Sequence, residues 1–442
     1  MAGATFLKGG VHPEEHKELT EHLAIEVMPL PDQVALPLSM HFGAPAKPIV
    51  ERKQKVEEGE PIAIIPERAL GAVIHSSVTG VVKGIEPRSH PTMVKCDAII
   101  IDRDPDAPPR EYPAEDWRSF SREQLLATIK DAGIVGLGGA GFPTHVKLSP
   151  PPSAKVDTLV LNGAECEPYL TTDHRLMLEY PEQVVVGAKI LLKTLGIKHC
   201  IIGVELNKPD AINALTKAAK AADVDELKVS VQGMVVKYPQ GSEKQLIYSL
   251  TQRSVPGGGL PFDVGVIVQN ISTTVAVFEA ATMGKPLYEK VMTVSGRAIS
   301  RPANVKVRVG TRLADVVDYL GGTTRDLLKI VSGGPMMGFA ISSLDVPVTK
   351  TTSGVLFLGS SETDLKPSGP CIHCGWCVKA CPMGLMPKEV AIYVEAGKGH
   401  LTEKFGVFEC FECGCCAYVC PAKRPLVQFA RLAKLQIKQA GK

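Results

Sequence analysis

The 442-residue sequence contains no apolar run long enough to span a membrane. Its two best candidates, residues 184–196 and 264–278, are interrupted by lysines or polar residues, and a membrane-spanning helix needs about 18 or more apolar residues in a row. The first residues, MAGATFLKGGVHPEEHKE, also lack the basic and then apolar order of a signal peptide. We therefore expect a cytoplasmic chain without a transmembrane helix, whose membrane contacts come through partner proteins.

The sequence also lacks an excess of charge of either sign and is poor in aromatic residues. Its 49 Lys and Arg residues balance 47 Asp and Glu residues, which leaves a formal net charge of +2, and aromatic residues make up 5% of the chain. This balance gives no reason to expect nucleic acid as a partner. The hydrophobic content of 45% is that of ordinary globular domains, and the length suggests two to four of them.

Twelve cysteines are present, and eight of them lie in two short runs. CIHCGWCVKACP, residues 371–382, and CFECGCCAYVCP, residues 410–421, both follow the spacing C-x2-C-x2-C-x3-C-P. Tight clusters without an export signal indicate metal or cluster ligation in a reducing compartment. A zinc site uses close pairs of ligands, whereas three cysteines at two-residue gaps suit three irons of a cubane, with a distant cysteine for the fourth. The runs therefore predict two [4Fe-4S] clusters and electron transfer.

We expect the two runs to share their ligands. In two-cluster ferredoxins the fourth cysteine of each run binds the other cluster. The predicted ligands of cluster one are Cys371, Cys374, Cys377 and Cys420. The predicted ligands of cluster two are Cys410, Cys413, Cys416 and Cys381. The remaining cysteines are expected to be small buried residues rather than ligands: Cys96, Cys166, Cys200 and Cys415.

Composition and periodicity predict a multidomain α/β protein. Short β-like runs early in the chain are similar to a barrel-sandwich domain of the biotinyl/lipoyl type, but residues 66–75 contain no lysine, which favours a structural module over a carrier of a swinging cofactor. Four prolines in residues 104–116 predict a linker, after which helical and strand patterns alternate. The expected parts are an N-terminal segment over 1–29, a barrel-sandwich domain over 30–105, an α/β domain over 112–287, a β-grasp domain over 288–345 and a helical, ferredoxin-like domain with the two clusters over 360–442.

A glycine-rich stretch, GLGGAGFPTHVK at residues 136–147, has the formal spacing G-x-G-x-x-G at Gly136, Gly138 and Gly141. It follows a helical pattern instead of a strand, so the context is wrong for a Rossmann fingerprint. Backbone amides without side chains can still approach a phosphate or a flat ring closely, and Lys147 adds a charge suited to a phosphate. The stretch is either a cofactor loop or a tight glycine turn.

The sequence resembles the NADH-oxidising, FMN-binding subunit of respiratory complex I in four segments that occur in the same order. The segments are GLGGAGFPTHVK, LNGAECEP, YPQGSEKQL and QNISTTVAVFEA, at residues 136–147, 161–168, 238–246 and 269–280. In the third segment Ser242 stands where that subunit has a glutamate. The resemblance implies an FMN site with NAD(H) as substrate over the flavin face.

Site residues are carried over from this resemblance by position. It implies cofactor-binding roles for Gly136 and Gly241 within the matching motifs. The residues that it implies for FMN are Gly138, Gly139, Gly141, Lys147, Asn162, Asn270 and Thr273. Those that it implies near NAD(H) are Phe142, Glu165, Glu167, Tyr238 and Glu243. Carboxylates near the adenosine ribose would disfavour a 2′-phosphate, so NADH is expected over NADPH. Hydride transfer needs no protein acid or base in its direct step, so no catalytic proton donor is expected.

Over nearly all its length the chain resembles the RnfC family, a peripheral component of Rnf ferredoxin:NAD oxidoreductase complexes. Besides the flavin segments, the resemblance rests on FLKGGVHPEEHKELT, HFGAPAKPIV, SGGPMMG and the two cysteine runs. It implies a β-grasp domain of the SLBB type. It also implies a peripheral position on the cytoplasmic face of the membrane, with the membrane and iron–sulfur subunits of the complex as partners and ferredoxin as an indirect one. Electron flow would be coupled by the complex to ion translocation.

Two other interpretations remain open. A flavo-iron–sulfur cobalamin reductase of bacterial microcompartments is similar in its flavin, β-grasp and twin-cluster parts, although residues 8–20 and 172–179 favour the RnfC family. The second interpretation is a non-catalytic iron–sulfur relay adaptor whose flavin and nucleotide sites are vestigial. The retained Lys147, Asn162, Glu165 and Glu243 argue against that adaptor.

Overall fold

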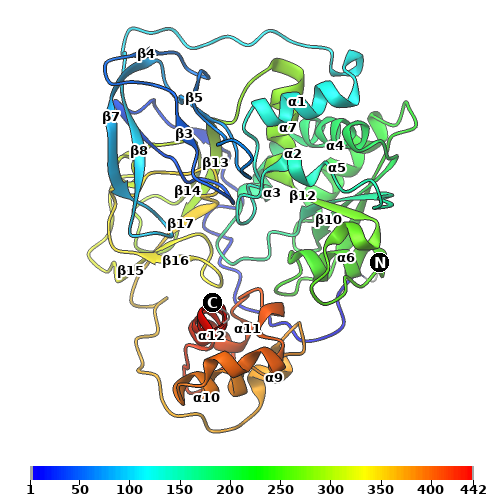
Figure 1. Ribbon diagram of the computed structural model, residues 1–442, viewed down its shortest axis with the longest axis vertical. Coiled ribbons are helices and arrows are strands. Elements are labelled where there is room, and N and C mark those ends of the chain that lie inside the picture. The colour runs from blue at the N-terminus through cyan, green and yellow to red at the C-terminus, as the bar shows by residue number, and fades with distance from the viewer. Residues whose placement is uncertain (1–2, 441–442) are drawn as a thin grey trace.

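The computed structural model describes residues 3–440 and forms a mixed α/β molecule with a separate helical domain at its C-terminal end (Figure 1). None of the helices in residues 3–440 is both long and apolar enough to cross a membrane. The barrel-sandwich, flavin-type, β-grasp and cluster-bearing parts follow one another in the predicted order.

The first domain consists of two small antiparallel sheets with the orders β2-β8-β7-β4 and β3-β5-β6. Their facing sides bury Val34, Leu36, Ile62, Ile99 and Ile101, which form the core of this barrel. The strands are β2 (Gln33–Pro37), β3 (Lys47–Pro48), β4 (Lys55–Val56), β5 (Pro61–Ile64), β6 (Ile74–His75), β7 (Gly80–Ser89) and β8 (Lys95–Arg103).

The second domain has a four-stranded parallel sheet in the order β11-β10-β9-β12, with helices packed against it (Figure 1). Its strands are β9 (Thr158–Gly163), β10 (His199–Glu205), β11 (Lys228–Met234) and β12 (Val266–Asn270). Its helices are η1 (Trp117–Ser119), α1 (Arg122–Asp131), α2 (Thr144–Lys147), α3 (Thr172–Glu179), α4 (Pro181–Leu195), α5 (Pro209–Ala221), α6 (Glu243–Thr251), η2 (Pro261–Val264) and α7 (Ile271–Met283). β10 and β11 extend the sheet on one side of β9, and β12 pairs on the other side, so the strand order reverses at β9.

Local sequence explains where these helices begin and end. Ser121 and Gln124 form a capping box at the start of α1, and Pro181 occupies the first turn of α4. Gly196 ends α4 in the left-handed conformation, which glycine adopts without steric cost. The Asn270 side chain caps α7 by accepting a hydrogen bond from the Thr273 amide.

The β-grasp domain is built on a six-stranded sheet in the order β1-β14-β13-β17-β15-β16, covered by helix α8 (Leu313–Tyr319). The strands are β1 (Glu26–Val27), β13 (Glu289–Ser295), β14 (Ala303–Arg308), β15 (Lys329–Ser332), β16 (Phe339–Ile341) and β17 (Gly354–Leu358). Two of them lie outside the predicted range 288–345: β1 comes from the N-terminal segment, and β17 follows the predicted end.

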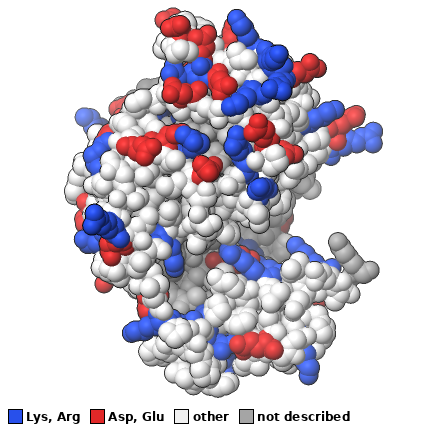
Figure 2. Space-filling model, turned by 90° about the vertical axis from the view of Figure 1, so that its left-hand side faces the viewer, with Lys and Arg blue, Asp and Glu red and all other residues white. Residues whose placement is uncertain are grey.

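The cluster-bearing domain contains short helices around the two cysteine runs and ends in the long helix α12 (Leu426–Ala440). The other helices are α9 (Trp376–Ala380), α10 (Pro387–Glu395), η3 (Gly399–Phe405), η4 (Val407–Glu409) and α11 (Cys415–Tyr418). Residues 359–370 connect it to β17 without a helix or strand. Figure 2 shows this domain as a lower lobe that a notch separates from the rest of the molecule.

Candidate functional site

The carboxyl ends of β9 and β12 meet where the strand order of the parallel sheet reverses. Asn162 lies near the end of β9, Asn270 ends β12, and the two residues are register partners across the strands. Ligands of open α/β sheets bind outside the carboxyl ends of the strands at such a reversal. Asn162 and Asn270 are 108 positions apart in the chain, and the sequence predicted both for one site. The fold makes them neighbours at the edge of the sheet where a ligand is expected.

The glycine loop lies over this place and follows helix α1 instead of a strand, as predicted. A bridge between Val135 and Pro143 closes the loop, and the Gly136 amide donates to the carbonyl of Phe142 at 2.9 Å. A Cβ at Gly138 would lie 2.6 Å from Nδ2 of Asn270, so only glycine allows the loop to approach the end of β12 this closely. A Cβ at Gly139 would meet nothing within 4 Å.

The loop is fixed on its other sides by the barrel and the β-grasp domain. Gly141 has φ +72°, its carbonyl accepts from the Phe42 amide at 2.9 Å, and a Cβ there would lie 2.7 Å from Cγ2 of Thr351. The rings of Phe42 and Phe142 lie 5.7 Å apart between centroids. Phe142 is half-buried, so part of its ring remains free to contact a ligand.

Lys147 and Glu243 form an ion pair of 2.6 Å between Nζ and Oε2. The resemblance implied Lys147 for the FMN phosphate and Glu243 for the nucleotide, so the structure brings the two predicted subsites into contact. Nearby, Nδ2 of Asn162 donates to the Gly241 carbonyl at 2.7 Å, and the Ala164 amide donates to Oδ1 of Asn162 at 3.2 Å. Asn162 thereby joins the end of β9 to the segment before α6.

Thr273 supports the loop from below. Its hydroxyl accepts from the Leu137 amide at 2.9 Å and its side chain is fully buried, so it has no surface to offer a ligand. The direct FMN contact that the resemblance implied for Thr273 is therefore corrected to a supporting role. Thr273 holds the first part of the glycine loop against the N-terminus of α7.

Asp173 is a residue of this site that sequence reasoning missed. Its carboxylate accepts from Nδ2 of Asn270 at 2.6 Å and from the Ser272 hydroxyl at 2.6 Å. Burial, and then the nearby charge of Glu165, raise the pKa of Asp173. The available signal was an acidic residue in the first turn of α3, within the segment TDHRLMLE.

The carboxylates of Glu165 and Glu167 are already hydrogen-bonded to backbone amides. Oε1 and Oε2 of Glu165 accept from the amides of Asp173 and His174, at 2.7 and 3.0 Å, and so cap the start of α3. Glu167 accepts from the amides of Met336 and Met337 at 3.0 and 2.9 Å. Burial raises the pKa of Glu167 to about 7. These carboxylates thus bind backbone amides of α3 and of the β-grasp domain, and a nucleotide role for them stays a prediction.

Tyr238 is also engaged within the protein. It is 2% exposed, and its hydroxyl donates to the main-chain carbonyl of Cys413 at 2.7 Å. The predicted nucleotide contact of Tyr238 is thus replaced by a contact with the second cysteine run. Tyr238 begins the YPQG segment that continues to Gly241, the partner of Asn162, so one short segment connects the glycine-loop site with the cluster-bearing domain.

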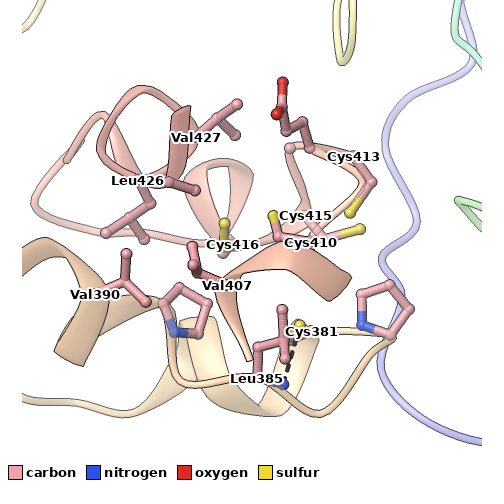
Figure 3. A pocket seen from close by; sticks show the side chains of 15 residues that line it. Cys381, Leu385, Val390, Val407, Cys410, Cys413, Cys415, Cys416, Leu426 and Val427 are labelled. Carbon is pink, nitrogen blue, oxygen red and sulfur yellow. Dashed lines mark hydrogen bonds between the residues drawn. The ribbon is translucent and has the colours of Figure 1, made fainter. Parts of the chain in front are cut away.

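One pocket of the cluster-bearing domain gathers the four cysteines predicted for cluster two (Figure 3). Cys381 comes from the first run and faces Cys410, Cys413 and Cys416 of the second. The amide of Leu385 donates to Sγ of Cys381 at 3.4 Å, drawn dashed in Figure 3. Burial raises the pKa of Cys381, so a thiolate there requires compensating positive charge of the kind that iron supplies. Apolar side chains complete the wall: Leu385, Val390, Val407, Leu426 and Val427.

A second pocket gathers the four cysteines predicted for cluster one. Cys420, from the second run, lies with Cys371, Cys374 and Cys377 of the first. This pocket is nearer to solvent: Cys374 is exposed, and Ile372 and Trp376 beside it are 64% and 56% exposed. Both pockets have the crossed grouping that a two-cluster ferredoxin requires, and the ligand assignment itself stays a prediction.

Within residues 3–440 no three His, Cys, Asp or Glu side chains lie as close together as the ligands of a single metal ion. The thiolates of a cubane stand farther apart, because each binds a different iron. Four thiolates around one apolar pocket are the donor set of an iron–sulfur cluster, so the residues fit that group.

The cysteines outside the predicted ligand sets differ in exposure. Cys200 and Cys415 are buried, as expected, whereas Cys96 and Cys166 are partly exposed, so the expectation of burial was wrong for those two. A hydrogen bond with the Cys415 thiol lowers the pKa of Cys413 and raises that of Cys415. Cys415 is thus the protonated neighbour of a predicted ligand.

Four family models match the chain in the order of its domains. They are described as the RnfC barrel sandwich hybrid domain over residues 5–106, the Nuo51 FMN-binding domain over 129–279, the SLBB domain over 291–340 and a 4Fe-4S dicluster domain over 370–423. The predicted fold class is confirmed by this order.

Full-length relatives decide the family. The chain is 45% identical to the C subunit of the proton-translocating ferredoxin:NAD(+) oxidoreductase complex of Clostridium ljungdahlii, over 98% of this chain and 94% of the relative. It is 41% identical to the C subunit of the Na(+)-translocating complex of Acetobacterium woodii, over 97% and 96% of the two chains. The C subunit of the ion-translocating oxidoreductase complex of Rhodobacter capsulatus is 40% identical, over 97% and 82%. The chain belongs to the RnfC family.

Membership of the RnfC family confirms the recognition made from sequence, and the matching domains confirm FMN and [4Fe-4S] clusters as its cofactors. Two solved structures of NAD+-reducing [NiFe]-hydrogenase, air-oxidised and H2-reduced, share the fold at 20% identity. The TM-scores are 0.50 and 0.51, and the alignments cover 65% and 74% of this chain and 54% and 63% of the others. The FMN-binding domain of this RnfC-family chain carries the open backbone at Gly139 and the paired asparagines that suit a phosphate and a flat ring.

Proposed function

We propose that this chain exchanges reducing equivalents between NAD(H) and two [4Fe-4S] clusters, as the peripheral subunit of a membrane-bound ferredoxin:NAD+ oxidoreductase. The observation that carries the proposal is that the segment from Tyr238 to Gly241 contacts both sites. Gly241 accepts from Asn162 at the glycine-loop site, and Tyr238 donates to Cys413 in the wall of the cluster-two pocket. FMN, when bound, supplies the conversion between hydride transfer and single-electron transfer, and the clusters take up single electrons.

The residues of the flavin site divide into those that face the cofactor and those that hold the loop. Gly138, Gly139 and the following amide groups bind the cofactor, with Lys147 as the charge for its phosphate. Asn162 and Asn270 orient the ring system at the end of the sheet, and Asp173 holds the Asn270 amide in place. Thr273 fixes the loop without touching the ligand.

The nucleotide subsite is proposed between Phe142 and Glu243. Phe142 is half-buried, and the side chain of Glu243 is 40% exposed, so both have surface for a ligand. A carboxylate accepts hydrogen bonds from ribose hydroxyls and repels a 2′-phosphate, which favours NADH over NADPH. We leave Glu165 and Glu167 out of this proposed subsite, because their carboxylates bind backbone amides.

Cluster two is proposed to be the cluster next to the flavin site, and cluster one the cluster next to the partner. The pocket of cluster two contains Cys413, which Tyr238 contacts directly. Tyr238 belongs to the second domain of the fold, which binds FMN and is called the flavin domain below. The pocket of cluster one lies beside the exposed Ile372 and Trp376, where another redox protein can approach.

The assembly is proposed from the names of the relatives, which are subunits of ion-translocating complexes. In this assembly the chain lies on the cytoplasmic face of the membrane and meets the membrane and iron–sulfur subunits of the complex. Ferredoxin then exchanges electrons with it only through those subunits.

The test uses the whole chain, reconstituted anaerobically with iron, sulfide and FMN, with NADH or NADPH added while the visible spectrum is recorded. We expect NADH, and NADPH much less, to bleach the flavin and then the cluster absorbance. A chain whose clusters are reduced by dithionite, but which neither binds FMN nor responds to NADH, would contradict the proposal and leave a relay adaptor.

A further inference from the structure

The N-terminal segment, residues 4–28, runs along three domains and is here called the strap. In Figure 1 its dark-blue trace passes between the cluster-bearing domain and the flavin domain. Ala4 bridges to Met234 at the end of β11, Val11 bridges to Tyr238, and Glu26 in β1 pairs with Val305 of β14. None of the cofactor roles assigned above uses the strap.

Two glycines of the strap touch the cluster-bearing domain next to a predicted cluster ligand. The Gly10 amide donates to the carbonyl of Ala380 at 2.9 Å. Gly9 has φ +63°, and a Cβ there would lie 2.5 Å from the carbonyl carbon and oxygen of Cys381. Because those are backbone atoms, a side chain at Gly9 would push Cys381 and the strap apart.

Val11 and Tyr238 connect this contact to the flavin domain. The Val11 amide donates to the Tyr238 carbonyl, and the Tyr238 amide donates to the Val11 carbonyl, both at 2.9 Å. The Tyr238 hydroxyl then reaches the carbonyl of Cys413 at 2.7 Å. Cys381 and Cys413 belong to different runs but to the same predicted cluster. The backbone at both residues is therefore connected to Tyr238, at Cys381 through the strap and at Cys413 through the tyrosine hydroxyl.

An apolar cluster excludes water from this junction. Buried side chains of the strap, the flavin domain and the cluster-bearing domain meet there, with Met336 of the β-grasp domain packed against them. They are Val11, Tyr238, Ala380, Cys413 and Cys415.

Lys17, in the middle of the strap, fixes it to the flavin domain. Its ammonium group is buried and donates to the carbonyls of Glu165, Glu167 and Leu170, at 3.0, 3.0 and 2.5 Å. Three carbonyl acceptors compensate for the lost hydration of one ammonium group. The strap is thus bound to the flavin domain through Lys17, and it contacts the cluster-bearing domain through Gly9 and Gly10.

The cluster-bearing domain has few other ties to the flavin domain. Residues 359–370 connect it to β17 as an extended segment, and at its rim Glu409 accepts from Nζ of Lys244 at 2.9 Å and from the Gly258 amide at 2.7 Å. Such partly exposed ion pairs contribute little stability. The junction at Val11 and Tyr238 is the better-buried tie.

We propose that Gly9, Gly10, Val11 and Tyr238 form a clamp that sets the separation between the FMN site and cluster two. These are positioning residues: they act by placing the cysteines, and Gly9 does so through the absence of a side chain. The inference rests on the proposed function, because it concerns transfer between the two cofactors that this function requires.

The test compares Gly9→Ala with Gly397→Ala in the whole reconstituted chain. Gly397 lies in the same domain as the clusters and has φ +69°, but an added Cβ meets nothing within 4 Å, so the control carries the backbone strain without the collision. FMN is reduced rapidly, by NADH or by light with a sacrificial donor, and flavin and cluster absorbance are followed separately. Hydrogen exchange at the Val11 and Tyr238 amides is measured on the same samples.

For Gly9→Ala we expect an unchanged flavin phase, faster exchange at Val11 and Tyr238, and a cluster phase slowed several-fold, because the rate of electron transfer falls steeply as two cofactors move apart. Gly397→Ala should match the wild type. Tyr238→Phe removes the hydroxyl contact with Cys413 and a longer one, of 3.4 Å, with Oε1 of Glu167. It should slow the cluster phase at unchanged iron and FMN content, and it is used in place of Gly9→Ala if that variant does not fold.

Wild-type cluster phases in the folded variants would overturn the clamp. Failure of the proposed function has a different signature, because NADH would then leave the flavin of the wild-type chain oxidised. Light-reduced FMN still tests the clamp in that case.

Discussion

The Tyr238 hydroxyl donates a 2.7 Å hydrogen bond to the main-chain carbonyl of Cys413. This contact joins a segment of the flavin domain to the loop that supplies three predicted ligands of one cluster. The glycine-loop site and the cluster-two pocket are therefore parts of one structural unit, and a change in either is expected to be felt at the other.

Gly139 gives the most selective test of the FMN site. An added Cβ meets no protein atom within 4 Å, so Gly139→Ala should leave the stability of the cofactor-free chain within about 0.5 kcal/mol of the wild type. If the cofactor lies against this backbone, the methyl group should weaken FMN binding by about tenfold or more, as expected for ~1–3 kcal/mol of overpacking. Fluorescence titration with FMN measures this, and unchanged affinity would place the cofactor elsewhere.

Lys147 is predicted to bind the phosphate of FMN. Lys147→Ala should weaken FMN binding by about 10- to 100-fold, because hydrogen bonds to charged groups contribute about 1.5–3 kcal/mol. Riboflavin, which has no phosphate, should bind the variant and the wild type equally. Lys217→Ala, at a lysine of α5, is the control. An equal loss for riboflavin would mean that Lys147 acts through its ion pair with Glu243 and not on the phosphate.

Glu167 should make stability fall as pH rises. Burial raises its pKa in the folded chain to about 7 from a usual value of 4.5, so between these values the folded chain retains a proton that the unfolded chain has lost. The free energy of unfolding therefore decreases with pH across this window and levels off above it. Glu167→Gln lacks this contribution, so the melting temperature of the wild type relative to the variant should drop from about pH 5 to about pH 7.5.

Anaerobic calorimetry of the two chains at several pH values measures this difference. Glu182→Gln, at an exposed residue in the first turn of α4, should keep the wild-type pH dependence. A constant difference between wild type and Glu167→Gln would show that the carboxylate is already ionised throughout the range.

Local patterns in the sequence predicted much of the fold and of the cluster site. The spacing of the two cysteine runs predicts their ligands because a short loop can reach three irons but not the fourth. The structure groups Cys381 and Cys420 with the opposite runs, as this prediction requires. The alternation of helices and strands indicated the parallel sheet, since buried parallel strands read as short apolar runs between amphipathic helices.

Long-range packing decided what the sequence left unresolved. The sequence assigned Glu165, Glu167 and Tyr238 to the nucleotide because their polar groups suit it. In the folded chain these groups bind backbone atoms of α3, the β-grasp domain and the second cysteine run, respectively. Asp173 escaped notice because nothing in a helical turn reveals that it will meet Asn270, 97 residues away. The strap likewise has no periodic pattern in its sequence. Its contacts join residues that are far apart in the chain, so the sequence alone did not predict them.

The most direct test of the account replaces one cysteine from each predicted ligand set. Cys381→Ser and Cys420→Ser chains, with Cys415→Ser as control, are reconstituted with FMN, mixed with NADH and examined by electron paramagnetic resonance at low temperature. The account predicts that Cys420→Ser retains an NADH-reducible cluster two, while in Cys381→Ser NADH reduces the flavin and the remaining cluster is reduced slowly or only by dithionite. Rapid reduction of the remaining cluster by NADH in Cys381→Ser, with none in Cys420→Ser, would contradict the proposed order from FMN through cluster two to cluster one.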